Sequence, residues 1–283
     1  MLMPAMTGKP RHKDLEKTLE QLRHRVAKIE ASKPPVLAQL PLWSDDVRSQ
    51  PNEVCRAALF TVRRAKKRES YVDSPLFMLG DGAITFTGIE LRAENDELVW
   101  LQILHYAKDY PLGSWVEFTP YQLCIDIGWT PGGPNYKILR ECLLRLKATA
   151  LTIESKRLRE GLALSLLGDF KWKDEKGKPL TRYAVQVPSA MSEWFGDTNF
   201  TRAQWEKYRG LPPVARRMHD YASSHREPFP LREETLYKLC GSDAGNLINF
   251  RKVLQRNCKE LLATGLYEQA AVSRDGLVRL VRK

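Results

Sequence analysis

The sequence predicts an α+β protein built of two tandem winged-helix domains, preceded by an N-terminal helix and a flexible linker. Two observations support this prediction. The C-terminal residues 230–283 follow the order helix, turn, helix and hairpin that is typical of a winged helix, and a similar unit occurs earlier in the chain. We expect residues 1–50 to hold the helix and linker, 51–190 the first winged-helix domain, and 191–283 the second.

Local signals predict the elements of the second unit. Residues 235–240 form a short helix, which ends at a glycine because glycine suits a helix C-terminus. A turn rich in Ser, Asp, Gly and Asn leads to a longer helix over residues 247–262. Two β-rich runs, 266–272 and 277–281, flank the turn 273–276, whose Ser-Arg-Asp-Gly sequence predicts a hairpin.

The longer helix has two unlike faces. Its apolar stripe consists of Leu247, Phe250, Leu254, Cys258 and Leu261. We expect the opposite, basic face to enter a major groove, while residues of the hairpin hold phosphates. The predicted DNA-binding residues of this unit are Asn249, Lys252, Gln255, Arg256, Lys259, Arg279 and Arg282. A helix with a solvated charged face is the alternative interpretation of the same pattern.

Repetition identifies the first unit. Residues 119–124 match 235–240 at Thr, Tyr, Leu and Cys, at an offset of 116 residues from Thr119 to Thr235. Residues 119–126 form the second helix of this unit and 134–147 the third, and a basic loop over 171–179 takes the place of a wing. Leu144 is expected on the exposed face of that helix, so this domain should be a weaker base reader, a backbone clamp or a protein interface. Its candidate DNA-binding residues are Lys137, Arg140, Arg145, Lys171 and Lys173.

Other elements are predicted from their apolar patterns. We expect helices over residues 95–109, 200–208 and 212–224, strands over 150–154, 162–170 and 181–187, and a hairpin that pairs 76–79 with 83–87. Arg216 and Arg217 lie on the helix over 212–224, where they would contact phosphates or be solvated. The basic run 63–68 is a solvated segment or a phosphate contact.

Composition limits the class of protein. The 283 residues carry a formal net charge of +11 and a pI of about 9.4, which favours a polyanionic partner. No apolar run approaches the roughly 20 residues of a membrane span, and residues 1–10 lack the apolar centre of a secretory signal. Five scattered cysteines without a Cys-x-x-Cys pair fit a reducing cytoplasm and predict neither disulfides nor a zinc site.

No enzymatic motif is present in the sequence. It lacks a phosphate-binding Gly-x-x-x-x-Gly-Lys-Ser/Thr loop, a Gly-x-Ser-x-Gly elbow and a His-Glu-x-x-His helix. The five histidines are not at metal-ligand spacing. We therefore expect no catalytic residues, no metal and no cofactor.

The N-terminal part contains two features. Residues 14–30 form a charged helix with a short heptad seam, which Pro34-Pro35 ends. In the linker that follows, Gln39-Leu40-Pro41-Leu42-Trp43 resembles the pentapeptide Gln-Leu-x-Leu-Phe by which bacterial proteins dock on the sliding clamp of the replicase. Gln39, Leu40, Leu42 and Trp43 would be exposed for that contact; the alternative is that the aromatic residue packs back onto the domain.

Together these residues resemble TrfA-type plasmid replication initiators, which are related to the tandem winged-helix Rep initiators. The resemblance covers the chain from about residue 39 to its C-terminus. The residues that carry it are Gln39 to Trp43, Ala57 to Thr61, Thr87 to Ala93, Asp96 to Trp100, Ala148 to Ala150, Trp205 to Arg209, Ala215 to Tyr221, Ser223 to Pro228 and Gly241 to Asp243.

The resemblance implies a function and a set of partners. It implies binding of monomers to directly repeated origin sequences (iterons) in double-stranded DNA, opening of the origin with a contact to single-stranded origin DNA, and recruitment of the host initiator and replicative helicase. It also implies contact with the sliding clamp through residues 39–43, and an inactive dimer that limits copy number.

Two other functions fit the same fold. A winged-helix transcriptional regulator, working as a homodimer, would bind an inverted repeat, because the symmetry of the dimer is mirrored in its site. A single chain with two unlike winged helices can instead read one asymmetric direct repeat. A non-specific architectural protein would show no preference among sequences.

Overall fold

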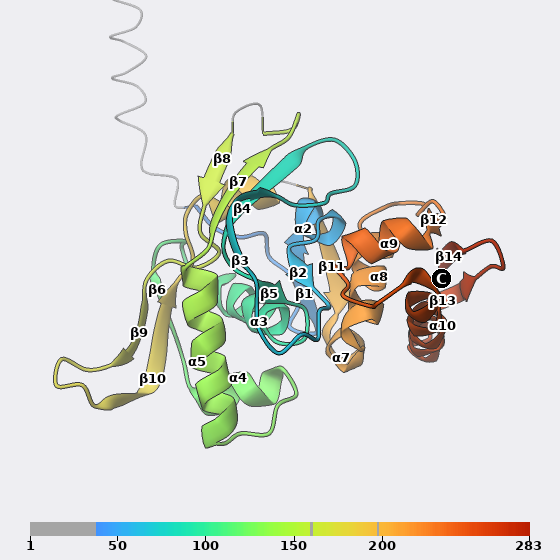
Figure 1. Cartoon of the computed structure of the whole chain (residues 1–283). Coiled ribbons are helices and arrows are strands. Elements are labelled where there is room, and N and C mark those ends of the chain that lie inside the picture. The colour runs from blue at the N-terminus through green and yellow to red at the C-terminus, as the bar shows by residue number, and fades with distance from the viewer. Residues whose placement is uncertain (1–37, 159–160, 197) are drawn as a thin grey trace, which may run out of the picture. The chain divides into compact units, whose positions relative to one another are not determined.

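Two hydrophobic cores organise the mixed α/β structure (Figure 1), which is a computed structural model. The first core takes its buried side chains from residues 40–208 and the second from residues 211–280. In Figure 1 the elements of the second core, coloured orange to red, lie together beside those of the first. The structure describes residues 38–158, 161–196 and 198–283.

The first core is built from short helices and several small sheets. The predicted helix over 14–30 lies outside the described residues. The elements in chain order are β1 (Val47–Pro51), α2 (Asn52–Arg56), β2 (Phe60–Thr61), β3 (Ser70–Pro75), β4 (Ala83–Ile89), β5 (Leu91–Arg92), α3 (Asp96–Ala107), β6 (Trp115–Phe118), α4 (Pro120–Asp126), α5 (Gly133–Lys147), β7 (Ala150–Glu154), β8 (Leu162–Leu164), β9 (Phe170–Lys173), β10 (Pro179–Gln186), α6 (Met191–Phe195), β11 (Phe200–Gln204) and α7 (Trp205–Gly210).

The first core contains four sheets, of which the strands β1 and β5 contact α3. The largest has the order β3-β4-β7-β8, a second has the order β6-β10-β9, and β1-β11 and β2-β5 are two-stranded. The apolar side chains of α3 from Leu98 to Leu101 are all buried, as are Ile103 and Leu104. A helix that is apolar on nearly every side must be covered on every side, and α3 is therefore the centre of the first core.

Two sequence predictions in this half need correction. The predicted hairpin exists, but its first strand is β3, which ends at Pro75. Leu76 extends the pairing by donating to the carbonyl oxygen of Ile84 at 2.8 Å, whereas Met78 bridges to Ala57 instead. Residues 200–204 are strand rather than helix, because they pair antiparallel with β1 in the register Val47 to Gln204. The helices predicted over 95–109, 119–126 and 134–147 are confirmed as α3, α4 and α5, within a few residues at their ends.

The pairing of β1 with β11 also affects the predicted domain division. Residues 191–208 were assigned to the second domain, yet Trp194, Phe195 and Trp205 are buried in the first core. Their position follows from β11, which returns the chain to the N-terminal strand. Along the chain, the boundary between the two cores lies between Tyr208 and Leu211. Independent folding of the predicted domains stays a prediction.

The second core contains the predicted helices and hairpin. Its elements are α8 (Pro213–Ser223), β12 (Leu231–Arg232), α9 (Glu233–Leu239), α10 (Leu247–Ala263), β13 (Tyr267–Val272) and β14 (Leu277–Arg282). The strand order is β12-β14-β13. Gly276, in the hairpin turn, has a φ of +80°, and a side chain there would lie 3.0 Å from Arg251 and Glu233. Glycine at this position lets the turn approach α10.

Arg216 and Arg217 are not at a phosphate-contact position, which corrects the prediction. Both side chains are buried, because α8 lies between the second core and the helices α2 and α3 of the first. Arg217 donates to the carbonyl oxygen of Ala57 at 2.6 Å and to the carboxylate of Asp220 at 2.9 Å. Buried charges need such partners, and this pair of arginines joins the two cores.

Candidate nucleic-acid interface

The exposed face of α10 carries the predicted reading residues. Asn246 caps the helix by accepting the backbone N–H of Asn249 at 2.8 Å. Phe250, Leu254, Cys258 and Leu261 are buried, which confirms the apolar stripe except for Leu247, whose side chain is half-buried. The five predicted residues of this helix are all exposed: Asn249, Lys252, Gln255, Arg256 and Lys259.

The basic residues of this face keep their charges available. Lys252, Arg256 and Lys259 take part in none of the ion pairs between residues that the structure describes. A cation without an internal partner can neutralise a phosphate or donate to a base edge without first breaking an ion pair. The face is therefore chemically suited to a polyanion.

Arg251 fixes α10 against the hairpin. Its guanidinium makes two hydrogen bonds to the carboxylate of Glu233, at 2.5 and 2.6 Å, and donates to the carbonyl oxygen of Arg274 at 3.2 Å. A bidentate arginine–carboxylate pair fixes orientation as well as distance. The helix and the β13–β14 turn are thus presented as one surface.

The two hairpin residues of the predicted set differ in exposure. Arg279 on β14 faces solvent. Arg282 is half-buried and donates to the carbonyl oxygen of His225 at 2.7 Å, so its guanidinium has an internal role. Arg274, at the exposed turn, lies outside the predicted set, and only the tertiary arrangement brings it beside α10.

In the first unit, the structure separates surface cations from an internal one. Lys137 of α5 is exposed and Arg140 is half-buried. Arg145 is bound to the fully buried carboxylate of Asp96, at 2.8 and 3.0 Å. The guanidinium of Arg145 is therefore occupied by a buried carboxylate and does not face DNA as predicted. Exposure of Leu144 is confirmed.

The β9–β10 hairpin presents the remaining predicted cations. Lys171 and Lys173 are both exposed. The ammonium of Lys171 lies 4.1 Å from the ring centroid of Trp115, a cation–π contact that holds the side chain over β6. Lys173 is closer to the hairpin tip, where Asp174 accepts the backbone N–H groups of Lys176 and Lys178.

The segment that resembles a clamp-binding peptide is folded onto the first core. Gln39 donates to the carbonyl oxygen of Lys108 at 3.0 Å, and Trp43 donates to Nδ1 of His105 at 3.1 Å. Leu40 and Trp43 are 2% and 7% exposed, whereas Leu42 is 66% exposed. Leu42 is therefore exposed as predicted and Leu40 is not, while Trp43 packs back onto the domain, as the alternative interpretation expected. Trp43 stacks against Phe195, which offers a better environment than water.

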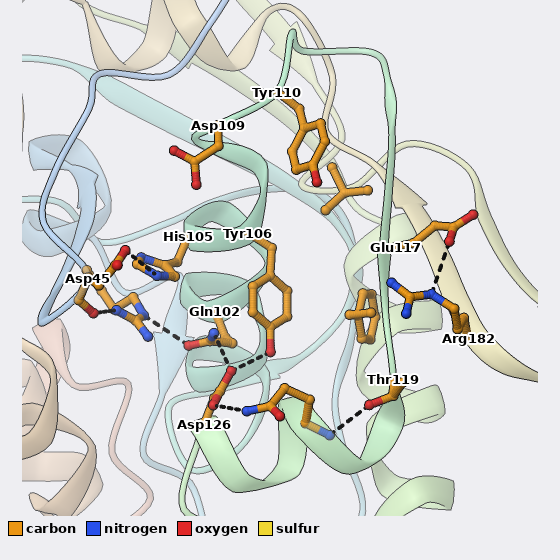
Figure 2. Close-up of a pocket in the computed structure, with 14 residues that line it drawn as sticks. Asp45, Gln102, His105, Tyr106, Asp109, Tyr110, Glu117, Thr119, Asp126 and Arg182 are labelled. Carbon is orange, nitrogen blue, oxygen red and sulfur yellow. Dashed lines mark hydrogen bonds and ion pairs between the residues drawn. The ribbon is translucent and has the colours of Figure 1, made fainter.

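A pocket of about 670 Å³ lies beside this segment (Figure 2). Its central carboxylate, Asp126, accepts hydrogen bonds from Tyr106 at 2.6 Å and from Gln102 at 3.1 Å. Burial and the neighbouring carboxylate raise the pKa of Tyr106, and burial lowers the pKa of His105 to about 4. The hydrogen bonds from Tyr106 and Gln102 of α3 to Asp126 of α4 hold the two helices together at the wall of this pocket.

The expectations about metals and cysteines can be compared with the structure. All five cysteines are buried and unpaired. Burial raises the pKa of each thiol. Within the part of the chain that the structure describes, no three His, Cys, Asp or Glu side chains gather closely enough to hold a metal ion. No helix among the described residues combines the length and apolar character that crossing a bilayer requires.

Comparison of the fold gives a distant likeness. A crystal structure of domains 2 and 3 of RctB superposes with a TM-score of 0.54 and 11% sequence identity, covering 82% of this chain and 98% of that one. A second structure of RctB domains 2–3 has a TM-score of 0.48 and 13% identity, over 79% of this chain and 95% of that one. At such identities the first likeness concerns the fold alone.

Comparison of the sequence is more specific. The plasmid replication initiator protein TrfA of Escherichia coli is 44% identical over 235 residues, which are 82% of this chain and 61% of that protein. The chain thus spans about three fifths of the length of that relative. The sequence pattern of the family described as TrfA protein matches residues 14–282. The chain belongs to the TrfA family.

Proposed function

We propose that this protein is a plasmid replication initiator that binds directly repeated origin sequences, or iterons. The observation that carries the proposal is the exposed basic face of α10, which presents Lys252, Arg256 and Lys259 on the side of the helix away from the second core. Membership of the TrfA family, and the name of the relative from Escherichia coli, support a role in plasmid replication. Binding of iterons requires no catalysis, and we assign no enzymatic step to the chain.

In this proposal the fold is two winged helices in tandem. The second consists of α8, α9, α10 and the β13–β14 hairpin, and the first of α3, α4, α5 and the strands that follow. The likeness to domains 2 and 3 of RctB supports a shared arrangement of the two halves. α10 is then the helix that enters the major groove, and the β13–β14 hairpin is its wing.

The proposed DNA-binding residues divide into those that contact base edges and those that contact phosphates. Lys252, Gln255 and Arg256 reach base edges, with Asn249 at the start of the helix, while Arg279 and Lys259 contact phosphates. The first unit contributes fewer cations, Lys137, Arg140, Lys171 and Lys173, and acts as a clamp on the backbone. With roughly 6–10 phosphate contacts, affinity falls by about 10³–10⁵ between about 50 and 200 mM salt.

Host proteins are the remaining proposed partners. They are the host initiator, the replicative helicase and the sliding clamp, and the protein passes between monomer and dimer. A contact of single-stranded origin DNA during opening belongs to the same proposal. For the clamp, Leu42 is already exposed, but Leu40 and Trp43 must leave the first core before they can dock. Clamp binding is therefore coupled to release of the segment from α3.

Footprinting on the DNA that flanks the coding region tests the proposal. Protection of several direct repeats, each of the same orientation, supports an initiator. Protection of a single inverted repeat supports the transcriptional regulator, because a symmetric dimer mirrors its own symmetry in the site. Uniform weak protection identifies a non-specific architectural protein and removes the proposal. A Lys252→Ala and Arg256→Ala double variant is the control, since it keeps the fold and loses the exposed cations.

A further inference from the structure

The basic run 63–68, between β2 and β3, contains two kinds of cation. Arg63 and Arg68 are bound to carboxylates: Arg63 lies 3.0 Å from Glu69, and Arg68 lies 2.8 Å from the buried Asp96. The exposed side chains of the run are those of Arg64, Lys66 and Lys67. None of these three takes part in an ion pair between residues that the structure describes.

The backbone of this loop is held from both cores. From the first core, Arg92 donates to the carbonyl oxygen of Ala65 at 2.7 Å. From the second core, the carboxylate of Asp243 accepts the backbone N–H groups of Arg64 and Ala65, both at 2.9 Å. Val62 adds a backbone hydrogen bond to Cys240 at 2.8 Å. The loop is thus fixed in place before any ligand arrives.

Asp243 lies in the turn between α9 and α10, immediately before the proposed reading helix. Partial burial opposes ionisation of this carboxyl, but the two backbone N–H groups outweigh it and hold the pKa of Asp243 below its usual range. Next to it, Gly241 adopts a φ of +53°, and a side chain there would lie 2.8 Å from Thr61. The turn and the basic loop therefore pack as one unit.

We propose that the loop 63–68 is a phosphate-binding arm of the α10 face, and that Asp243 positions it. The inference rests on the proposed function and adds a first-core segment to the second-core reader. A helix in a major groove about 12 Å wide has a phosphate strand on either side. Arg64 shares a hollow of about 320 Å³ with Asn257, which lies on the flank of α10 that binds α8. The loop is also bound to Asp243 in the turn that leads into α10, so the arm lies beside the start of the helix that would occupy the groove.

Two physical effects make opposite predictions for Asp243. As a negative charge near DNA, Asp243 repels phosphates. If this repulsion is its main effect, removal of the carboxylate strengthens DNA binding. As an acceptor for two backbone N–H groups, Asp243 holds the loop that carries Arg64, Lys66 and Lys67 in place. If the loop is a pre-positioned arm, removal of the carboxylate weakens DNA binding. The sign of the change separates the two roles.

The probe is a duplex selected from a random-sequence pool by the wild-type chain, and affinity is measured by fluorescence anisotropy at several salt concentrations. We expect the triple variant Arg64→Gln, Lys66→Gln, Lys67→Gln to lower the slope of log K against log salt by about 0.9 for each phosphate that is no longer neutralised, on selected and scrambled duplexes alike. We expect Asp243→Ala to weaken binding by about three- to tenfold, and Asp243→Asn, which keeps an acceptor oxygen, to stay closer to wild type.

Lys156→Gln is the matched control, because Lys156 is an exposed cation just after the end of β7, 84% exposed and paired with Asp81. Thermal unfolding by circular dichroism shows that each variant is folded. An unchanged salt slope in the triple variant, or tighter binding by Asp243→Ala, overturns the inference. If either overturning result occurs while Arg256→Ala still weakens DNA binding, the proposed function is retained and only the role of the loop 63–68 is rejected. If the wild-type chain binds no duplex, both fall.

Discussion

The guanidinium of Arg217 lies 3.3 Å from the carboxylate of Glu97, and neither side chain has any exposed surface. Arg217 belongs to α8 of the second core and Glu97 to α3 of the first. The same arginine donates to the carbonyl oxygens of Val54 and Ala57 at the end of α2. The two halves of the molecule are therefore joined by a buried charge network, which constrains how α8 meets α2 and α3.

We expect Arg217→Met to destabilise the protein by about 3–5 kcal/mol, because it leaves Asp220 buried without its cation and leaves Glu97 with Arg216 alone. Arg217→Lys should recover little of this loss, since an ammonium cannot reach both carboxylates and the α2 carbonyls at once. Urea unfolding measures the free energy. The exposed Arg279→Met is the control and should change it by less than about 0.5 kcal/mol. A loss below about 1 kcal/mol for Arg217→Met would show that the network contributes little.

Arg256 and Arg145 should respond differently to alanine substitution. Arg256→Ala removes an exposed side chain, so we expect it to weaken binding to the selected duplex by about 1–3 kcal/mol and to relax specificity at one base pair. Arg145→Ala breaks the pair with Asp96 and should lower stability while leaving the affinity of the folded protein unchanged. Equal losses on cognate and scrambled DNA for Arg256→Ala would remove this residue from the readers.

Stability should fall in mild acid because of His219. Burial, with the nearby charge of Arg282, lowers the pKa of this histidine from 6.5 to about 4. The unfolded chain therefore binds the proton more tightly than the folded protein does. The stability that neutral His219 contributes to the folded protein is fully present above about pH 6.5 and is lost as the pH falls towards about 4. We expect a loss of about 1–2 kcal/mol between about pH 7 and pH 5.

The His219→Gln variant tests the assignment. Its free energy of unfolding at about pH 7 can be lower than that of the wild type, because the hydrogen bond between His219 and the Tyr267 hydroxyl is altered. Its dependence on pH should nevertheless be shallower over the same interval. Identical pH profiles for the two proteins would mean that other groups cause the acid loss.

Release of Trp43 should control any binding of the sliding clamp. His105→Ala removes the acceptor for the Trp43 ring N–H and loosens the segment 39–45. Because apparent affinity scales with the fraction of competent conformer, we expect about three- to tenfold tighter clamp binding by this variant. Surface plasmon resonance with immobilised clamp measures it. Leu42→Ala in the same background should abolish the gain, and weaker binding by His105→Ala would contradict a docked, masked segment.

Several features could be predicted from the sequence because they depend on neighbouring residues. The apolar stripe of α10 repeats with the helical period, so Phe250, Leu254 and Leu261 could be assigned to the interior and Lys252 and Arg256 to the surface. The β13–β14 hairpin follows from its turn sequence. Family membership followed from short strings of residues, and the match over 14–282 confirms it.

The sequence by itself determined most of the helices, the β13–β14 hairpin and which face of α10 is basic. The tertiary structure decided which cations remain on the surface. Arg145 is held by Asp96 at a separation of 49 residues, and Arg217 by Glu97 at a separation of 120. The reason is that a charged residue looks the same along the chain whether it is solvated or paired, and the partner that buries it is brought close only when distant segments pack.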